Sequence, residues 1–115
     1  PWFSPIKCGI MEKIYCFSTK GMNDMNLMDS RQQIDEIDKQ ITVLLEERMK
    51  VVAAVAAYKK AHSMPVLDAT REAAVLDKVA VFTSDKLLVP YIKRIYQALM
   101  DESKAYEADE MKRNG

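Results

Sequence analysis

Glycine, proline, cysteine and histidine are all scarce in this sequence. Its 115 residues include three glycines, four prolines, two cysteines and a single histidine, His62. Few residues therefore interrupt helices, which favours a compact all-α fold with long helices. Both cysteines, Cys8 and Cys16, precede residue 26, so the main body has no disulfide framework and suits a reducing, cytoplasmic compartment. One histidine excludes a histidine-rich metal site, and no Cys–His or Ser–His–Asp set indicates nucleophilic catalysis.

The sequence also lacks net charge and long apolar runs. Seventeen basic and seventeen acidic residues cancel, so no overall field attracts nucleic acid or an anionic membrane, and recognition of an anion must be local. No apolar run approaches the ~18 residues that a membrane span needs. We therefore expect neither nucleic acid nor a membrane as a partner.

The first 25 residues differ in composition from the rest of the chain. Proline, glycine and serine interrupt any regular pattern there, and Lys7 and Lys13 break the apolar runs, which argues against a signal peptide. We interpret residues 1–25 as an N-terminal extension without a function of its own. Residues 26–115 are then expected to form one helical domain.

A helical spacing of apolar residues begins at Asn26. The stripe consists of Leu27, Ile34, Ile37, Ile41, Leu44, Leu45, Val52 and Val55. No glycine or proline occurs between Asn26 and Met64, which predicts one helix of over thirty residues. Such a helix cannot bury its stripe alone, so it needs a partner helix or a second chain.

Two prolines separate the helices that follow. Pro65 disfavours a helical conformation just before it, Asp68 is a natural N-cap, and a second helix is expected at about 69–82. After the turn TSDK, Pro90 suits the first turn of a third helix, which we expect to end at about Lys112. The predicted fold is all-α, with one long, one short and one medium helix.

Two cations interrupt the apolar stripe of the first helix. Arg48 and Lys59 are eleven residues apart, so they share a face and lie ~16 Å from each other. On the third helix the same spacing puts Ser103 and Glu107 on the packed side. Because charged groups are rarely buried without partners, two interpretations stay open. The cations either form structural ion pairs with Glu107 or Glu72 or extend to the surface, or they line a pocket for a small anion.

A similar choice applies to the segment VLDATREAAVL, residues 66–76. Asp68 and Glu72 lie where a helix begins, so they are expected to cap it and to complement its dipole. The alternative is that both acids and Arg71 face a ligand.

Arg31 precedes Arg48 by seventeen residues, which is ~25 Å along one helix and roughly 100° around it. One straight helix cannot bring Arg31 and Lys59 to the same small ligand. If both serve one pocket, Arg31 must come from a second, antiparallel copy of the chain.

Four segments together resemble the all-α class of chorismate mutases. They are Arg31 with IDEID, LLEERMKVVAAVAAYKK, PVLDATREAAVL and YIKRIYQALMDESKAYE, and they cover about residues 26–111. The most specific elements are the spacing Arg-x16-Arg-x10-Lys and the segment PV-x-D-x-x-RE. The resemblance implies an intertwined homodimeric bundle of three-helix chains, whose long first helices pair across the two-fold axis.

The resemblance also implies an active site, carried over position by position. Its catalytic residues are Arg48, Lys59, Glu72 and Glu107, and its substrate-binding residues are Asp68, Arg71, Ser103 and, from the other chain, Arg31. Two departures occur. The last position is often glutamine in the bacterial dimers and is Glu107 here, and the segment between the second and third helices is one residue shorter than in some relatives.

The implied reaction is the pericyclic rearrangement of chorismate to prephenate in phenylalanine and tyrosine biosynthesis, an isomerisation that requires no nucleophile, metal or cofactor. Arg48 and the other chain's Arg31 would clamp the two carboxylates. Lys59 would bind the ether oxygen, Glu72 the ring hydroxyl with Asp68 nearby, and Ser103 a carboxylate, while Arg71 would add positive potential and orient Glu72.

Glu107 can donate a hydrogen bond to the ether oxygen only when it is protonated. We therefore expect activity to fall as this proton is lost at higher pH, and Glu107→Gln to flatten the pH profile. Two rival functions stay open. Isochorismate-pyruvate lyase is the nearest, although the intact D-x-x-RE segment favours the mutase, and a non-catalytic or regulatory helical dimer is the other.

Overall fold

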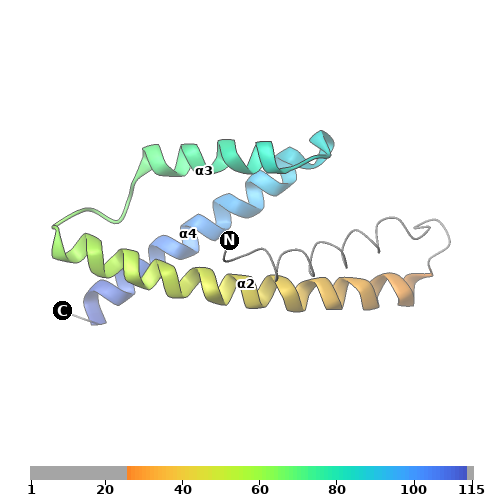
Figure 1. Cartoon of the computed structure of the whole chain (residues 1–115), viewed down its shortest axis with the longest axis horizontal. Coiled ribbons are helices and arrows are strands. Elements are labelled where there is room, and N and C mark those ends of the chain that lie inside the picture. The colour runs from red at the N-terminus through yellow and green to blue at the C-terminus, as the bar shows by residue number, and fades with distance from the viewer. Residues whose placement is uncertain (1–25, 114–115) are drawn as a thin grey trace, which may run out of the picture. The chain divides into compact units, whose positions relative to one another are not determined.

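The structure, a computed structural model, describes residues 26–113. Within that range the chain forms α2 (Leu27–Ala61), α3 (Ala69–Phe82), a short 3-10 helix η2 (Lys86–Leu88) and α4 (Val89–Arg113) (Figure 1). The described part is therefore all-α with three α-helices, as the sequence predicted. The predicted extension at residues 1–25 lies outside the described residues.

Helix α2 is the long helix that the sequence predicted, with 35 residues. Asn26 begins it, because its side-chain Oδ1 accepts a hydrogen bond from the amide of Asp29 at 2.8 Å. Two residues after the helix ends at Ala61, Ser63 adopts a left-handed conformation with φ 54°. The amide of Met64 then reaches back to the carbonyl of Lys59 at 2.8 Å, and Pro65 prevents any continuation.

Helix α3 begins and ends at side chains that satisfy its free backbone groups. Asp68 is its N-cap, and the carboxylate accepts the amide of Arg71 at 3.0 Å. At the other end Thr83 donates both its hydroxyl and its amide to the carbonyl of Val79, at 2.7 and 3.1 Å. The predicted cap at Asp68 and the predicted span 69–82 are confirmed.

The turn before α4 contains a helical turn that the sequence analysis did not predict. Asp85 caps η2 by accepting the amide of Leu87 at 3.1 Å. Helix α4 then starts at Val89, and Pro90 lies in its first turn. Backbone N–H groups in a first turn have no partner within the helix, so proline, which lacks an N–H, loses no hydrogen bond there. A three-residue 3-10 helix is too short to leave a periodic pattern in the sequence.

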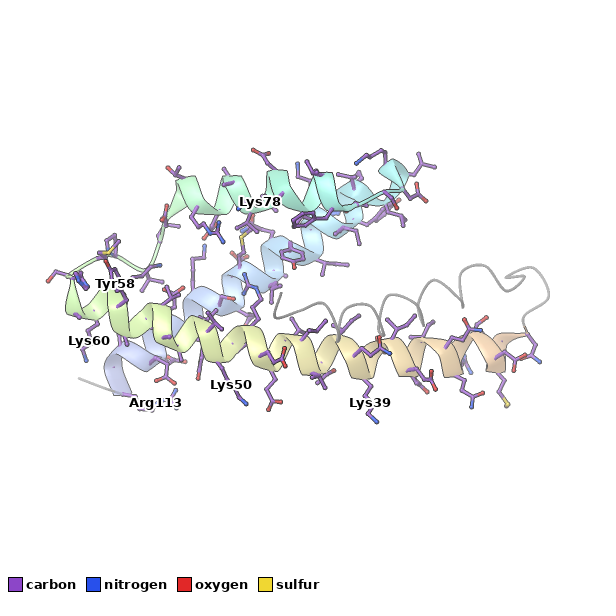
Figure 2. All side chains as sticks on the ribbon, in the orientation of Figure 1. Lys39, Lys50, Tyr58, Lys60, Lys78 and Arg113 are labelled. Carbon is purple, nitrogen blue, oxygen red and sulfur yellow. The ribbon has the colours of Figure 1, made fainter. Side chains whose placement is uncertain are left out.

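By their contacts, the described residues fall into two units, with the boundary between residues 47 and 48. In the second unit α3 packs against α4. Lys60, which Figure 2 labels near the end of α2, donates to the carbonyl of Met111 on α4 at 2.7 Å. The buried apolar side chains of the described residues are Ala56, Val79 and Met100, one from each α-helix.

The part of α2 that belongs to the first unit, residues 27–47, leaves most of its apolar stripe exposed. Leu27, Ile34 and Ile41 are 64%, 54% and 47% exposed, and Leu44 and Leu45 are exposed as well. Apolar faces of this length are normally covered by another helix. Among the described residues, no helix combines the length and hydrophobicity that crossing a bilayer requires.

Candidate active site

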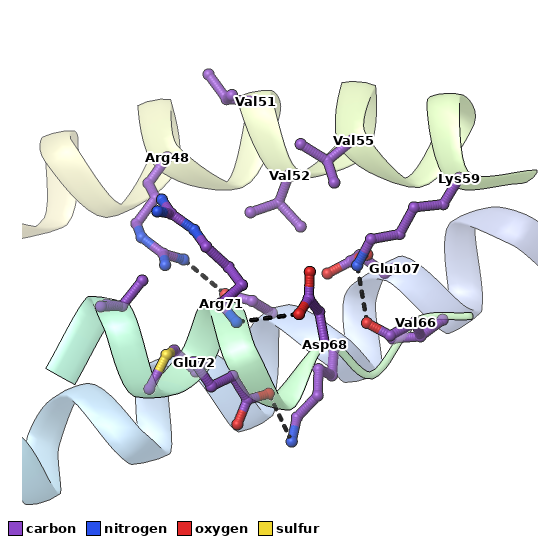
Figure 3. Close-up of a pocket in the computed structure, with 14 residues that line it drawn as sticks. Arg48, Val51, Val52, Val55, Lys59, Val66, Asp68, Arg71, Glu72 and Glu107 are labelled. Carbon is purple, nitrogen blue, oxygen red and sulfur yellow. Dashed lines mark hydrogen bonds and ion pairs between the residues drawn. The ribbon is translucent and has the colours of Figure 1, made fainter. Parts of the chain in front are cut away.

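The second unit contains a cavity of about 380 Å³ between its helices. Helix α2 supplies one wall, α3 and α4 supply the others, and Val66 comes from the segment that joins α2 to α3 (Figure 3). The lining residues are Arg48, Val51, Val52, Val55, Lys59, Val66, Asp68, Arg71, Glu72, Val75, Met100, Ser103, Lys104 and Glu107. An apolar surface of valines is thus combined with charged groups from all three helices.

Arg48 contacts the buried hydroxyl of Ser103. The Nη1 atom donates to Ser103 Oγ at 2.7 Å, and the same hydroxyl donates to the carbonyl of Leu99 at 2.8 Å. Ser103 is only 6% exposed, so it fixes the half-buried guanidinium against α4. Within residues 26–113 Arg48 forms no ion pair with a carboxylate, and its charge therefore remains available to an anion in the cavity.

Lys59 and Glu107 form the most buried ion pair of the described residues. Lys59 Nζ lies 2.9 Å from Glu107 Oε1, and the two side chains are 12% and 9% exposed. Lys59 also donates to the carbonyl of Val66 at 2.8 Å. The Oε1 atom is buried, and no donor of the described residues meets it in hydrogen-bond geometry, so the contact with Lys59 is an ion pair by distance alone.

The segment that begins α3 places three charged side chains at the cavity. Asp68 and Arg71 are exposed, whereas Glu72 is half-buried. Glu72 Oε2 lies 3.0 Å from Lys104 Nζ on α4. Arg71 forms no ion pair within the described range, and its side chain extends toward Arg48 in Figure 3.

The charges that line the cavity do not cancel. Four side chains are cationic (Arg48, Lys59, Arg71 and Lys104) and three are acidic (Asp68, Glu72 and Glu107). Two of the cations are paired with acids, and the third acid caps a helix. The two arginines are left without carboxylate partners among the described residues, which makes the cavity suited to a small anion.

Seven of the eight predicted site residues line this one cavity. The eighth, Arg31, belongs to residues 1–47, whereas every lining residue belongs to residues 48–115. Lys59 makes the ion pair that the structural interpretation expected, and Arg48 makes none in the described part of the chain. The functions of these residues stay a prediction.

Lys104 is the charged lining residue that the sequence analysis did not single out. It follows Ser103 directly, and together with Met100 and Glu107 it completes a 3-4 spacing on one face of α4. That spacing was the available signal. The hydrogen bond to Glu72 raises the pKa of Lys104 above its ordinary value, burial opposes this, and Asp101 adds a smaller upward effect.

Comparison with known proteins identifies the family. The sequence model of type II chorismate mutases matches residues 30–108. The chain belongs to the type II chorismate mutase family. Over 79 residues it is 34% identical to a bifunctional chorismate mutase/prephenate dehydratase of Buchnera aphidicola subsp. Schizaphis graminum, a match that covers 68% of this chain and 20% of that protein.

A shorter relative of the family is similar as well. A monofunctional chorismate mutase of Enterobacter agglomerans is 40% identical over 70 residues, which cover 56% of this chain and 39% of that protein. The chain thus spans about a fifth of the bifunctional relative and two fifths of the monofunctional one. No solved structure matches the chain significantly.

Proposed function

We propose that this chain converts chorismate to prephenate. The observation that carries the proposal is the cavity of a type II chorismate mutase chain in which Arg48 has no carboxylate partner among residues 26–113. Chorismate carries two carboxylates, one on its ring and one on its enolpyruvyl side chain. Its rearrangement requires a confined conformation and well-placed cations and donors, both of which a cationic cavity with valine walls provides.

The reaction breaks the C–O bond of the enolpyruvyl ether and forms a C–C bond in the same molecule. Cleavage runs ahead of bond formation, so negative charge builds on the ether oxygen. Lys59 has three N–H bonds, of which one donates to Val66 and a second faces Glu107. The third is free to donate to the ether oxygen, where it stabilises the transition state more than the ground state.

Glu107 can donate to the same oxygen only when its carboxyl carries a proton. Its buried Oε1 atom lacks a hydrogen-bond donor among the described residues. A protonated carboxyl donates to the ether oxygen, whereas an ionised one repels the charge that develops there. Protonation also leaves the charge of Lys59 uncompensated, which favours a dianionic substrate.

The two carboxylates of chorismate bind at different cations. Arg48 binds one of them with its planar fork, and Ser103 assists from α4. Arg31 of a second copy binds the other. This assignment is supported by the surplus of cationic over acidic side chains that line the cavity, which suits a dianionic substrate.

A homodimer is part of the proposal. The exposed stripe of Leu27, Ile34 and Ile41 gives α2 an apolar face that a second copy of the same helix covers. Arg31 lies on this same part of α2, so the contact that buries the stripe also brings Arg31 to the other copy's cavity.

The ring hydroxyl of chorismate donates to Glu72, with Asp68 nearby, and Arg71 adds positive potential to the cavity.

We also propose that residues 26–115 form the catalytic domain. A reducing, cytoplasmic location is supported by the absence of cysteine from residues 17–115.

The test is a chorismate-depletion assay on the purified full-length chain, with the product identified and the mass in solution measured. We expect prephenate to accumulate without any added cofactor, and the mass to equal two chains. Isochorismate is assayed in parallel. Pyruvate release from isochorismate without turnover of chorismate would establish the lyase instead, and binding of chorismate without turnover would establish a regulatory domain.

A further inference from the structure

Lys104 is a cation of the cavity that the proposed mechanism does not use. Its Nζ atom lies 3.0 Å from Glu72 Oε2, and the side chains are 29% and 19% exposed. Glu72 is in the first turn of α3, and Lys104 is on α4. The ion pair therefore links the two helices at the edge of the cavity that both residues line (Figure 3).

Glu72 needs such a partner if it is to accept a hydrogen bond from the substrate. A carboxylate without a cation beside it repels a dianion in a cavity of this size. The neighbouring Arg71 forms no ion pair in the described range. Lys104 makes the contact instead, and it binds the Oε2 atom, so Oε1 is left for another donor.

Lys104 is itself held from the solvent side. Its Nζ atom lies 3.4 Å from Asp101 Oδ1, and the same oxygen accepts a hydrogen bond from Gln97 Nε2 at 3.1 Å. Gln97, Asp101 and Lys104 follow one face of α4 at i, i+4 and i+7. This row of polar side chains directs the ammonium group toward Glu72.

Stability alone does not explain the arrangement. Lys104 is nearly a third exposed and Asp101 is 55% exposed, and ion pairs at that exposure contribute little to folding. Both partners of the Lys104–Glu72 pair nevertheless lie at the cavity rather than on the outer surface.

We propose that Lys104 is a positioning residue for the mutase reaction. Lys104 neutralises Glu72 and holds its carboxylate in place, so that one carboxylate oxygen accepts a hydrogen bond from the ring hydroxyl of the substrate. The inference rests on the proposed function. Lys104 acts through Glu72 and does not itself contact the reacting atoms.

The first arm of the test compares three lysine variants of the full-length chain. Lys104→Met is expected to lower kcat/KM for chorismate by about ten- to a hundredfold, because a misplaced substrate-binding group has effects of that size. Lys104→Arg keeps the charge and the reach, and it should restore most of the activity. Lys78→Met removes an exposed lysine of α3 outside the cavity lining (Figure 2), and it should leave activity unchanged.

A double-mutant cycle with Glu72→Gln is the second arm. If Lys104 acts through Glu72, Lys104→Met causes no further loss of kcat/KM in the Glu72→Gln background. An equal loss in both backgrounds would show that Lys104 acts independently of Glu72, and it would overturn the proposal. Lys104→Gln serves as a second variant if the methionine variant folds poorly.

Chorismate in which hydrogen replaces the ring hydroxyl gives a third arm. Lys104→Met should lose less activity on this analogue than on chorismate, because the hydroxyl that donates to Glu72 is missing and only the repulsion from an unneutralised Glu72 remains. If Lys104→Met is as active on chorismate as Lys78→Met, the Lys104–Glu72 ion pair has no role in the reaction, and the proposal is overturned. The wild-type chain is assayed on chorismate in every arm. If it does not convert chorismate, the proposed function is wrong, whereas the results for the variants test the role of Lys104.

Discussion

Replacing Arg48 by methionine separates the catalytic role of this residue from its structural role. Methionine keeps much of the length and removes the charge and the donors. Within residues 26–113, the guanidinium forms a single hydrogen bond, the 2.7 Å bond to Ser103. After the replacement Ser103 still donates to the carbonyl of Leu99 at 2.8 Å, so no buried hydroxyl is left without a partner.

The two effects of this substitution should differ in size. Losing one hydrogen bond costs about 1 kcal/mol of stability, and the loss is offset because an unpaired cation leaves the half-buried site. A planar fork bound to a carboxylate makes two charge-assisted hydrogen bonds, which together contribute about 3–5 kcal/mol. If Arg48 holds a substrate carboxylate through the transition state, kcat/KM falls about 10²- to 10⁴-fold.

The assay follows the loss of chorismate, and urea unfolding of the same samples reports stability. Lys50→Met is the matched control, because Lys50 is an exposed cation on α2 that does not line the cavity (Figure 2). Arg48→Lys keeps the charge without the fork and should fall between wild type and Arg48→Met. The reasoning is refuted if Arg48→Met retains wild-type kcat/KM, or if its activity falls only in proportion to unfolded protein.

Three further outcomes follow from the contacts of α4. Lys59→Met leaves the Glu107 carboxylate buried without its cation, so we expect a stability loss on the order of 3 kcal/mol in urea unfolding, and Lys59→Met/Glu107→Gln should recover most of it. Glu107→Gln should flatten the pH dependence of kcat/KM, whereas a wild-type profile that is already flat between about pH 5 and 8 would contradict the protonated role of Glu107. A hydrogen bond to Glu110, together with burial, raises the pKa of Tyr106. The stability that results is present below pH ~10 and lost as pH rises through the higher folded-state value, so Tyr106→Phe should be less stable than wild type at pH 8, and a difference of the same size at pH 11 would count against this contact.

Local signals in the sequence were sufficient to predict the helices. The scarcity of glycine and proline, the apolar stripe from Leu27 onward, Pro65 and the capping carboxylate of Asp68 act within a few residues of the structure they determine. The predicted all-α fold and the span of α3 are accordingly confirmed. The short helix η2 was missed because one 3-10 turn has no periodicity.

Side-chain partners were harder to predict than helices, because they depend on how the helices pack. Spacing alone placed Arg48 and Lys59 on one face, but it did not reveal that Lys59 is paired with a carboxylate and that Arg48 is not. It also did not indicate that Glu72 on α3 meets Lys104 on α4. The position of Arg31 in a dimer depends on a second chain and stays a prediction.

Complementation between two inactive variants tests most directly whether two chains build one cationic site for a dianion. Arg31→Ala and Arg48→Ala are each expected to be nearly inactive on chorismate. When the two are unfolded and refolded together in equal amounts, half of the dimers are mixed, and each mixed dimer has one site with both arginines. We predict a recovery to about a quarter of wild-type activity per chain. Activity of the mixture that merely equals the average of the two separate variants would contradict the shared site.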